Sequence, residues 1–291
     1  LTNRFFFNDK RITESYTFSL HGALRIYKGN VVTPEAGDWA IGFNAAPMFN
    51  YVGNMFNGST GNSLNTAFAT GNQAIYGKYF TDENTAFRGS LRIMTMSQKM
   101  GSMIDTNTAT GNAAEYVENS MKASGFGLVL SGGIEKRKGH GRLQGYYGGE
   151  VSITFGGTTP NTEYTYGVAL DSTTIADNVM QSNTGNSNLD NTALNGRTIS
   201  SKAGSTFGFG IRGFIGAEYF FAPKISVAAE YGWGLSLQST SGGETVTENW
   251  GVVDPATAPT NYEMTTMTAK SSTFGIDTDN LGGVIRIMFH F

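Results

Sequence analysis

The sequence predicts an all-β fold in the form of an antiparallel, up-and-down transmembrane β-barrel, and three observations lead to this prediction. Read with period two, residues 284–291 have one uniformly apolar face and one face that carries charge. Seven earlier segments show similar alternation. The chain also contains 39 Gly and 12% aromatic residues, which suits many strands and turns better than helices. A strand with lipid on one face and a polar lumen on the other requires such alternation.

The C-terminal segment shows the pattern most clearly. Its apolar face consists of Ile285, Ile287, Phe289 and Phe291. Its other face carries Arg286 and His290. A soluble protein rarely ends on an exposed Phe, but the last strand of a membrane barrel can do so because it closes the sheet.

Hydropathy averaged along the chain does not reveal this pattern. The mean hydropathy is -0.22, and no run reaches the roughly 18–20 apolar residues of a membrane helix. Charged residues make up 15% of the 291 residues, below the roughly 25% of an average globular domain. Strands that alternate apolar and polar residues contain no long apolar run, so the low mean hydropathy and the low charged fraction are compatible with a barrel.

The first four predicted strands place an apolar residue or Gly at every second position, and the first two are the weaker ones. They are about 38–51 (Trp39, Ile41, Phe43), about 73–81 (Ile75, Gly77, Tyr79), about 85–97 (Phe87, Leu91, Ile93) and about 124–136 (Phe126, Leu128, Leu130, Ile134).

The last four predicted strands alternate more regularly. They are about 142–156 (Leu143, Tyr147, Val151, Ile153, Phe155), about 205–220 (Phe207, Phe209, Ile211, Ile215, Tyr219), about 224–238 (Ile225, Val227, Tyr231, Trp233, Leu235) and about 280–291. The aromatic residues Trp39, Tyr79, Tyr147, Tyr231 and Trp233 are expected to anchor the barrel at the lipid interface.

The connections alternate between short and long. Short turns are expected at 81–84, 137–141 and 221–224, whereas the long loops, rich in Asn, Thr, Ser and Gly, are about 52–72, 98–123, 157–204 and 239–272. Short periplasmic turns and long extracellular loops are typical of outer-membrane barrels.

If both termini lie on the short-turn side, the strand number must be even, and eight strands satisfy this. The expected domains are an N-terminal periplasmic extension, residues 1–37, and the barrel itself, residues 38–291. Residues 18–26 have some strand character, and a ten-strand barrel is the structural alternative.

The face of each strand opposite the apolar one collects the charged residues. The residues predicted to form a charge network in the lumen are Lys78, Arg88, Arg92, Glu135, Arg142, Glu150, Arg212, Glu218, Glu230 and Arg286. Isolated buried ions are costly, so these groups must pair or stay hydrated. Paired carboxylates could do acid–base chemistry, but neighbouring Arg residues favour a structural network. The interior of an eight-strand barrel is just wide enough for side chains to fill, which argues against a wide pore.

Several function classes are not supported. The net charge is -3 without a basic cluster, so we expect no nucleic-acid partner. The chain has no Cys, and its three His lack metal-ligand spacing, so no metal or cofactor is expected. No signal peptide is visible, as expected for a processed, exported form.

Two local motifs have ordinary explanations. Residues 208–213 match G-x-G-x-x-G but lie inside a strand, so a dinucleotide site is not expected. The basic run at 136–138 could touch acidic headgroups or a periplasmic partner, and more often such a run is a solvated turn. A lipid hydrolase would need Ser and His together near the outer rim, where no His is predicted, so we expect no enzyme.

Residues 216–232 resemble the hairpin of the small outer-membrane β-barrel superfamily of Gram-negative bacteria, which is porin-like and includes OmpA-type membrane domains, OmpX, OmpW and opacity-type proteins. The stretch has a Gly-x-Glu-Tyr strand, a short Pro turn and a second Glu-Tyr strand. The ending with Ile287, Phe289 and Phe291 is similar to the C-terminal signal read by the barrel-assembly machinery. The resemblance implies a location in the cell outer membrane, contact with its lipid and lipopolysaccharide, and assembly by that machinery.

The resemblance implies no single activity, and three hypotheses follow. The first is a non-enzymatic structural or interaction role, as an accessory subunit of a larger outer-membrane complex with other outer-membrane proteins. The second is a narrow channel for ions or small solutes. The third is a surface adhesin or ligand binder that acts through the long loops.

Overall fold

The computed structural model describes residues 26–27, 30–58, 74–106, 113, 115–139, 141–157, 159–172, 192–193, 196–276 and 284–291. Strands dominate this part of the chain, and its principal helix is α2, Ala46–Phe56. The prediction of an all-β antiparallel fold is confirmed.

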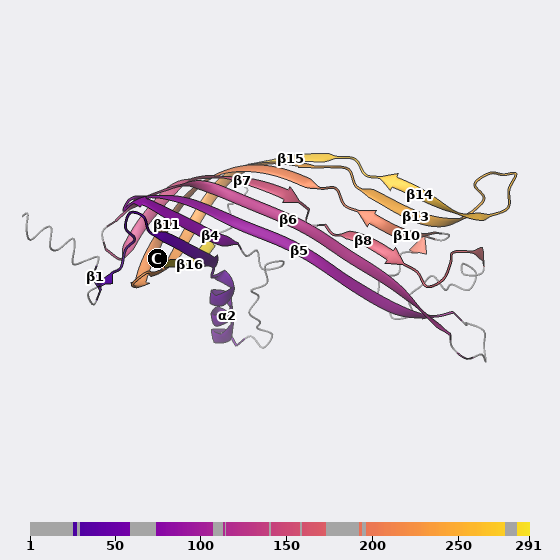
Figure 1. Cartoon of the computed structure of the whole chain (residues 1–291), viewed down its shortest axis with the longest axis horizontal. Coiled ribbons are helices and arrows are strands. Elements are labelled where there is room, and N and C mark those ends of the chain that lie inside the picture. Colours follow the sequence, from indigo (N-terminus) through magenta and orange to yellow (C-terminus); the bar gives the residue numbers. More distant parts are fainter. Residues whose placement is uncertain are drawn as a thin grey trace, which may run out of the picture.

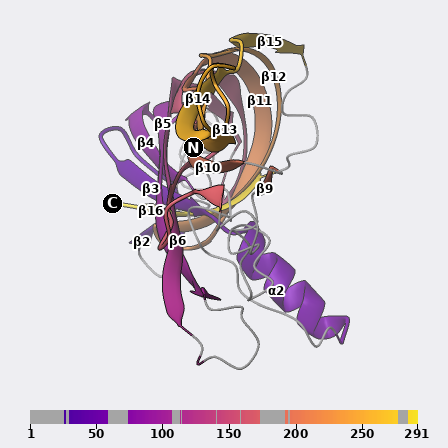
Figure 2. The ribbon, with the colours of Figure 1, turned by 90° about the vertical axis from the view of Figure 1, so that its right-hand side faces the viewer.

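Eight strands form a closed, hydrogen-bonded ring at one end of the molecule (Figures 1 and 2). In ring order they are β3 (Trp39–Asn44), β4 (Ile75–Asp82), β5 (Thr85–Asp105), β6 (Tyr116–Lys138), β7 (Leu143–Gly156), β11 (Thr206–Ala222), β12 (Ile225–Thr240) and β16 (Val284–His290). Every pairing is antiparallel, and β16 closes the ring against β3 with Phe289 opposite Ile41. Each of the eight strands lies within or overlaps a predicted one, so the ring has eight strands and not ten.

The short connections all lie at one end of the ring, as expected. The β11–β12 turn needs a left-handed residue, which is Lys224 with a φ of 62°. The chain end is joined to the first ring strand at this level: Trp39 N–H donates to the Phe291 carbonyl and Phe291 N–H donates to the Trp39 carbonyl, both at 2.9 Å. The C-terminus therefore lies on the short-turn side.

The two faces of the ring differ in polarity as the alternation predicts. Along β11, Ile211 and Ile215 point outward and are 51% and 63% exposed, whereas Glu218 and Phe220 point inward and are fully buried. The buried apolar residues inside include Phe80, Tyr146, Phe214 and Met288. The ring thus has an exposed apolar exterior and a buried, charge-bearing interior.

The predicted long loops 98–123, 157–204 and 239–272 are not simple loops, and that prediction was wrong. β5 and β6 continue far beyond the ring, and the sheet extends from β6 through further strands to an arched extension (Figure 1). The extension contains β8 (Asn161–Thr165), β9 (Thr192–Ala193), β10 (Gly196–Lys202), β13 (Glu244–Gly251) and β14 (Thr260–Met267), and β15 (Ser271–Ile276) pairs with the far part of β12.

The first strand was predicted too long. It ends at Asn44, and α2 follows where the strand 38–51 and the loop 52–72 were expected. Pro47 suits the first turn of a helix because its missing N–H is not needed there. The Asn44 side chain accepts the Ala46 N–H at 3.0 Å, which turns the chain out of the sheet. In both views α2 points away from the ring (Figures 1 and 2).

Only part of the predicted N-terminal extension is described. β1 (Ile26–Tyr27) and β2 (Asn30–Val31) form a short hairpin. Most of the possible strand at 18–26 lies outside the described residues. Within the described part of the chain, we find no helix whose length and apolarity would let it cross a membrane.

Candidate functional site

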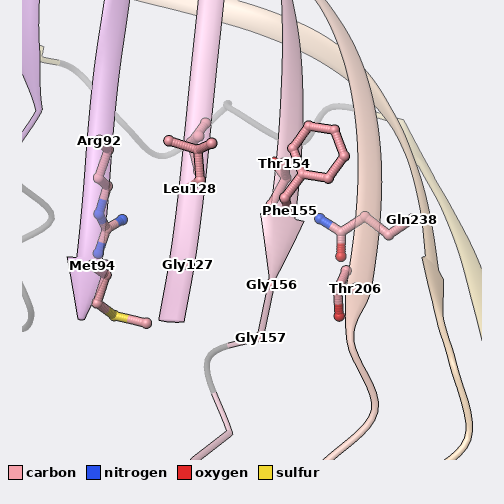
Figure 3. Close-up of a pocket in the computed structure, with 11 residues that line it drawn as sticks. Arg92, Met94, Gly127, Leu128, Thr154, Phe155, Gly156, Gly157, Thr206 and Gln238 are labelled. Carbon is pink, nitrogen blue, oxygen red and sulfur yellow. The ribbon is translucent and has the colours of Figure 1, made fainter. Parts of the chain in front are cut away.

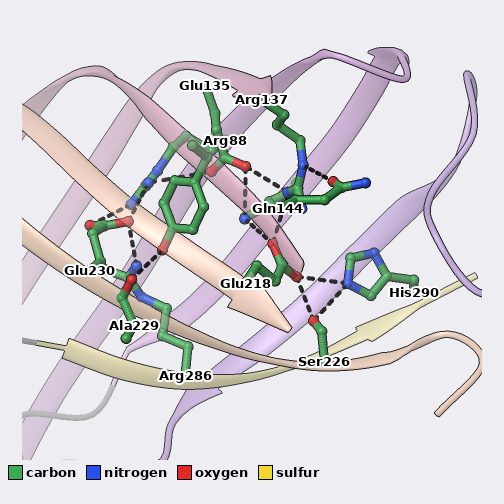
Figure 4. Close-up of polar contacts among 12 residues, drawn as sticks. Arg88, Glu135, Arg137, Gln144, Glu218, Ser226, Ala229, Glu230, Arg286 and His290 are labelled. Atoms are coloured by element: carbon green, nitrogen blue, oxygen red, sulfur yellow. Dashed lines mark hydrogen bonds and ion pairs between the residues drawn. The ribbon is translucent and has the colours of Figure 1, made fainter. Parts of the chain in front are cut away.

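A cluster of ion pairs fills the interior of the ring toward its short-turn end (Figure 4). We call it the ion-pair cluster, and it consists of Lys78, Arg88, Glu135, Arg137, Glu150, Arg212, Glu218, Glu230, Arg286 and His290. All of these residues come from inward positions of ring strands, so the alternation of the strands is what brings them together.

Glu218 is the centre of the half nearest the turns. One carboxylate oxygen accepts from Lys78 Nζ at 3.1 Å and from Arg137 at 2.8 Å. The other accepts from the Ser226 hydroxyl and lies 3.1 Å from His290 Nε2. Glu135 binds the same two cations, Lys78 at 3.0 Å and Arg137 at 2.8 Å. This half therefore balances two cations with two carboxylates.

Glu230 is the centre of the other half. Its two oxygens accept from both Arg88, at 2.6 and 3.2 Å, and Arg286, at 2.7 and 3.2 Å. Arg212 binds Glu230 at 2.6 Å and Glu150 at 3.0 Å. Arg88 also reaches Glu150 at 3.1 Å. Arg88 also lies 3.5 Å from Glu135, which joins the two halves. In the whole cluster, five Lys and Arg cations therefore face four carboxylates.

Aromatic rings pack against the cations of the ion-pair cluster. The Arg88 guanidinium lies 3.9 Å from the Phe214 ring centroid, and Arg286 lies 4.1 Å from that of Tyr76. Lys78 lies 4.7 Å from the Tyr146 ring centroid. Cations over aromatic faces are stabilised by the ring quadrupole, most strongly when they are desolvated.

Two glycines create room for the aromatic rings. A Cβ atom on Gly148 would meet the Phe214 ring 2.6 Å away, and one on Gly216 would collide with the Tyr146 ring. These inward positions therefore must lack side chains.

The structure brings eight of the ten predicted lumen residues into the cluster. The two others are Arg92, which lines a cavity farther from the turns, and Arg142, which lies beside the β6–β7 turn. Arg137 was missed, because the run 136–138 looked like a solvated turn. Arg137 is only 4% exposed, and its sequence position two residues after inward Glu135 is the signal that could have revealed it. His140 and His21 lie outside the described residues.

Ser226, His290 and Glu218 meet inside the ring but do not form a catalytic triad. In a triad the acid holds one imidazole nitrogen and the Ser binds the other. Here His290 Nε2 faces both the Ser226 hydroxyl, at 3.1 Å, and the Glu218 carboxylate. Ser226 is fully buried and donates to Glu218, so the hydroxyl is neither activated by His290 nor accessible to a substrate.

A second polar cluster stabilises the extension. Arg197 of β10 is 5% exposed, binds Glu248 of β13 at 2.7 Å, and lies 4.2 Å from the Tyr166 ring centroid. The Tyr166 hydroxyl donates to the Thr198 carbonyl at 2.7 Å. Burial of the phenol raises the pKa of Tyr166 to about 12.

A surface ion pair joins the start of β3 to the β11–β12 turn. Lys224 Nζ donates to Asp38 at 2.7 Å, and the Glu35 N–H donates to the same carboxylate at 3.0 Å. Partial burial opposes ionisation of Asp38, but these two hydrogen bonds outweigh it and lower the pKa of the carboxyl.

In the described ranges, no group of three or more His, Asp or Glu side chains is arranged to hold a metal ion. No protein-family model, no characterised protein and no solved structure matches this chain.

Proposed function

We propose that the chain is an integral outer-membrane β-barrel protein with a non-enzymatic structural or interaction role, acting as an accessory subunit of a larger outer-membrane complex. The observation that carries this proposal is the distribution of polarity around the ring. Its exterior is apolar and exposed, and its interior is filled by paired charges.

The exterior suits contact with lipid. Large exposed side chains on the outward positions include Phe87, Leu130, Ile153, Ile211, Ile215, Trp233 and Phe289. A strand that crosses a bilayer needs about 9–11 residues, and β11 has 17. In water so large an apolar surface would favour aggregation, whereas in a bilayer it needs no other cover.

The interior argues against a channel as the main role. The ion-pair cluster and the aromatic residues around it occupy the lumen at one level, and breaking buried pairs is costly. A scaffold with a closed interior is therefore favoured over a permanently open pore.

The extension is the surface that we assign to a protein partner. It presents large exposed side chains on β14 and β15, among them Tyr262, Met264 and Phe274. Within the described part of the chain, β14 pairs on one side only, with β13. A strand edge of this kind can accept a strand from another protein.

Purification from native membranes in mild detergent tests the subunit role. We expect an outer-membrane protein to co-purify with the wild type and to be lost from the double variant Tyr262→Lys/Met264→Lys on β14. Met103→Lys, at a half-exposed position on the far part of β5, is the matched control and should retain the partner. A lone monomer from wild-type membranes would contradict the subunit role.

A further inference from the structure

The ring holds a cavity on the side of the ion-pair cluster away from the short turns (Figure 3). Its volume is about 170 Å³, more than a single water molecule fills. The polar side chains that line it are Arg92 of β5, Thr154 of β7, Thr206 of β11 and Gln238 of β12. None of its lining residues is acidic.

Strand register explains how the cavity is built. Arg92, Val129, Thr154, Gly208 and Gln238 form one inward row across five neighbouring strands. The next inward row toward the turns contains only small residues: Ser90, Ser131, Ser152, Gly210 and Ser236. The cavity lies on the other side of the Arg92 row, where Met94, Gly127, Gly156 and Thr206 form the next row away from the turns. Arg92 and Gln238 extend toward it from opposite ends of their row (Figure 3).

The electrostatics beneath the cavity favour negative charge. The row below the small residues contains Arg88, Glu150 and Arg212 of the ion-pair cluster, in which five Lys and Arg cations face four carboxylates. Arg92 adds a further cation at the cavity itself. A narrow, low-dielectric lumen with an excess of positive charge favours the entry of anions.

From this arrangement we infer that the cavity is a binding site for a small oxyanion, a phosphate or a carboxylate group. The Arg92 guanidinium supplies charge-assisted hydrogen bonds, and the Thr154 and Thr206 hydroxyls and the Gln238 amide supply neutral donors. This goes beyond a scaffold role and does not depend on whether the ring lies in a bilayer.

Calorimetric titration of the full chain in zwitterionic detergent at low salt tests the inference, with inorganic phosphate and acetate as separate probes. We expect saturable binding of at least one probe at one site per chain. Arg92→Gln should weaken it at least about tenfold. Gln238→Met, which keeps the length of the side chain, should weaken it by a smaller factor.

Lys122→Gln is the matched control, because Lys122 is an exposed cation of β6 outside the cavity. It should bind as the wild type does. The inference is overturned if neither probe binds saturably, or if Arg92→Gln and Gln238→Met both bind with wild-type affinity. A lipid-insertion assay decides the membrane role separately, so failure here leaves that proposal intact.

Discussion

In the half of the cluster near the turns, Glu218 contacts more different side chains than any other residue. It is fully buried and accepts hydrogen bonds from Lys78, Arg137 and Ser226. Removing one partner from such a group leaves the others as uncompensated buried charges, which costs more than the pair contributes.

Glu218→Gln should therefore lower the free energy of unfolding by about 3–5 kcal/mol. Urea unfolding of protein in lipid vesicles, followed by gel mobility without heating, measures this. Glu163→Gln is the control, because Glu163 is 69% exposed and lies 4.0 Å from Lys122. Such a pair contributes less than about 1 kcal/mol. Equal effects of the two substitutions would contradict the buried network.

Tyr166 gives a second test at the residue scale. Its pKa of about 12 lies above the roughly 10 of a free phenol, because the ring is buried in the extension. A raised pKa means that the folded state holds the proton, so its stabilising contribution is lost as the pH rises from about 10 through 12. The ultraviolet titration of wild type minus Tyr166→Phe should show one phenol ionising near pH 12. Ionisation near pH 10 would contradict the buried placement.

Asp38 behaves in the opposite sense. Its pKa is lowered, so the Asp38–Lys224 pair stabilises the fold above the ordinary Asp pKa of about 4 and is lost as the pH falls through the lower value of the folded state. The carboxylate is partly exposed, so we expect less than about 1 kcal/mol. Acid unfolding of Asp38→Asn should show a shallower loss of stability than wild type. If Asp38→Asn and the wild type lose stability to the same extent as the pH falls, the Asp38–Lys224 pair contributes nothing to stability.

At the scale of elements, the ring strands could be predicted from the sequence and the extension could not. β11 separates the apolar exterior of the ring from its charge-bearing interior, so its side chains must alternate. β14 has all eight residues exposed, and nothing in its surroundings selects alternation. Arg137 shows the same limit within the site, because neighbouring Lys136 and Lys138 hide an inward residue in a basic run. α2 was missed because its apolar residues also fit a strand when read over few positions.

The extension depends on contacts between distant strands, and Arg197 provides the test. Arg197→Met removes the pair with Glu248 and leaves that carboxylate with the Asn261 amide. We expect faster amide hydrogen exchange in β8, β10 and β13, with unchanged protection of β11 and β12. Faster exchange in both regions would show that ring and extension unfold as one unit. No change in either would show that the pair does not hold the extension.

At the scale of the whole molecule, a closed interior predicts an electrically silent barrel. Single-channel recordings of the full chain in planar bilayers should show no steady conductance, because the ion-pair cluster occupies the lumen. A steady conductance that changes on replacing Arg212 or Glu218 would instead favour the narrow-channel hypothesis.

We propose that the apolar exterior of the ring faces lipid. Two single-Trp variants test it: one retains Trp233, which points outward from β12 and is 49% exposed, and the other retains Trp250 on β13 of the extension. Both are reconstituted into vesicles whose acyl chains carry bromine, which quenches Trp only at close range. We expect strong quenching of Trp233 and little quenching of Trp250. Little quenching of Trp233, or equal quenching of both, would contradict it.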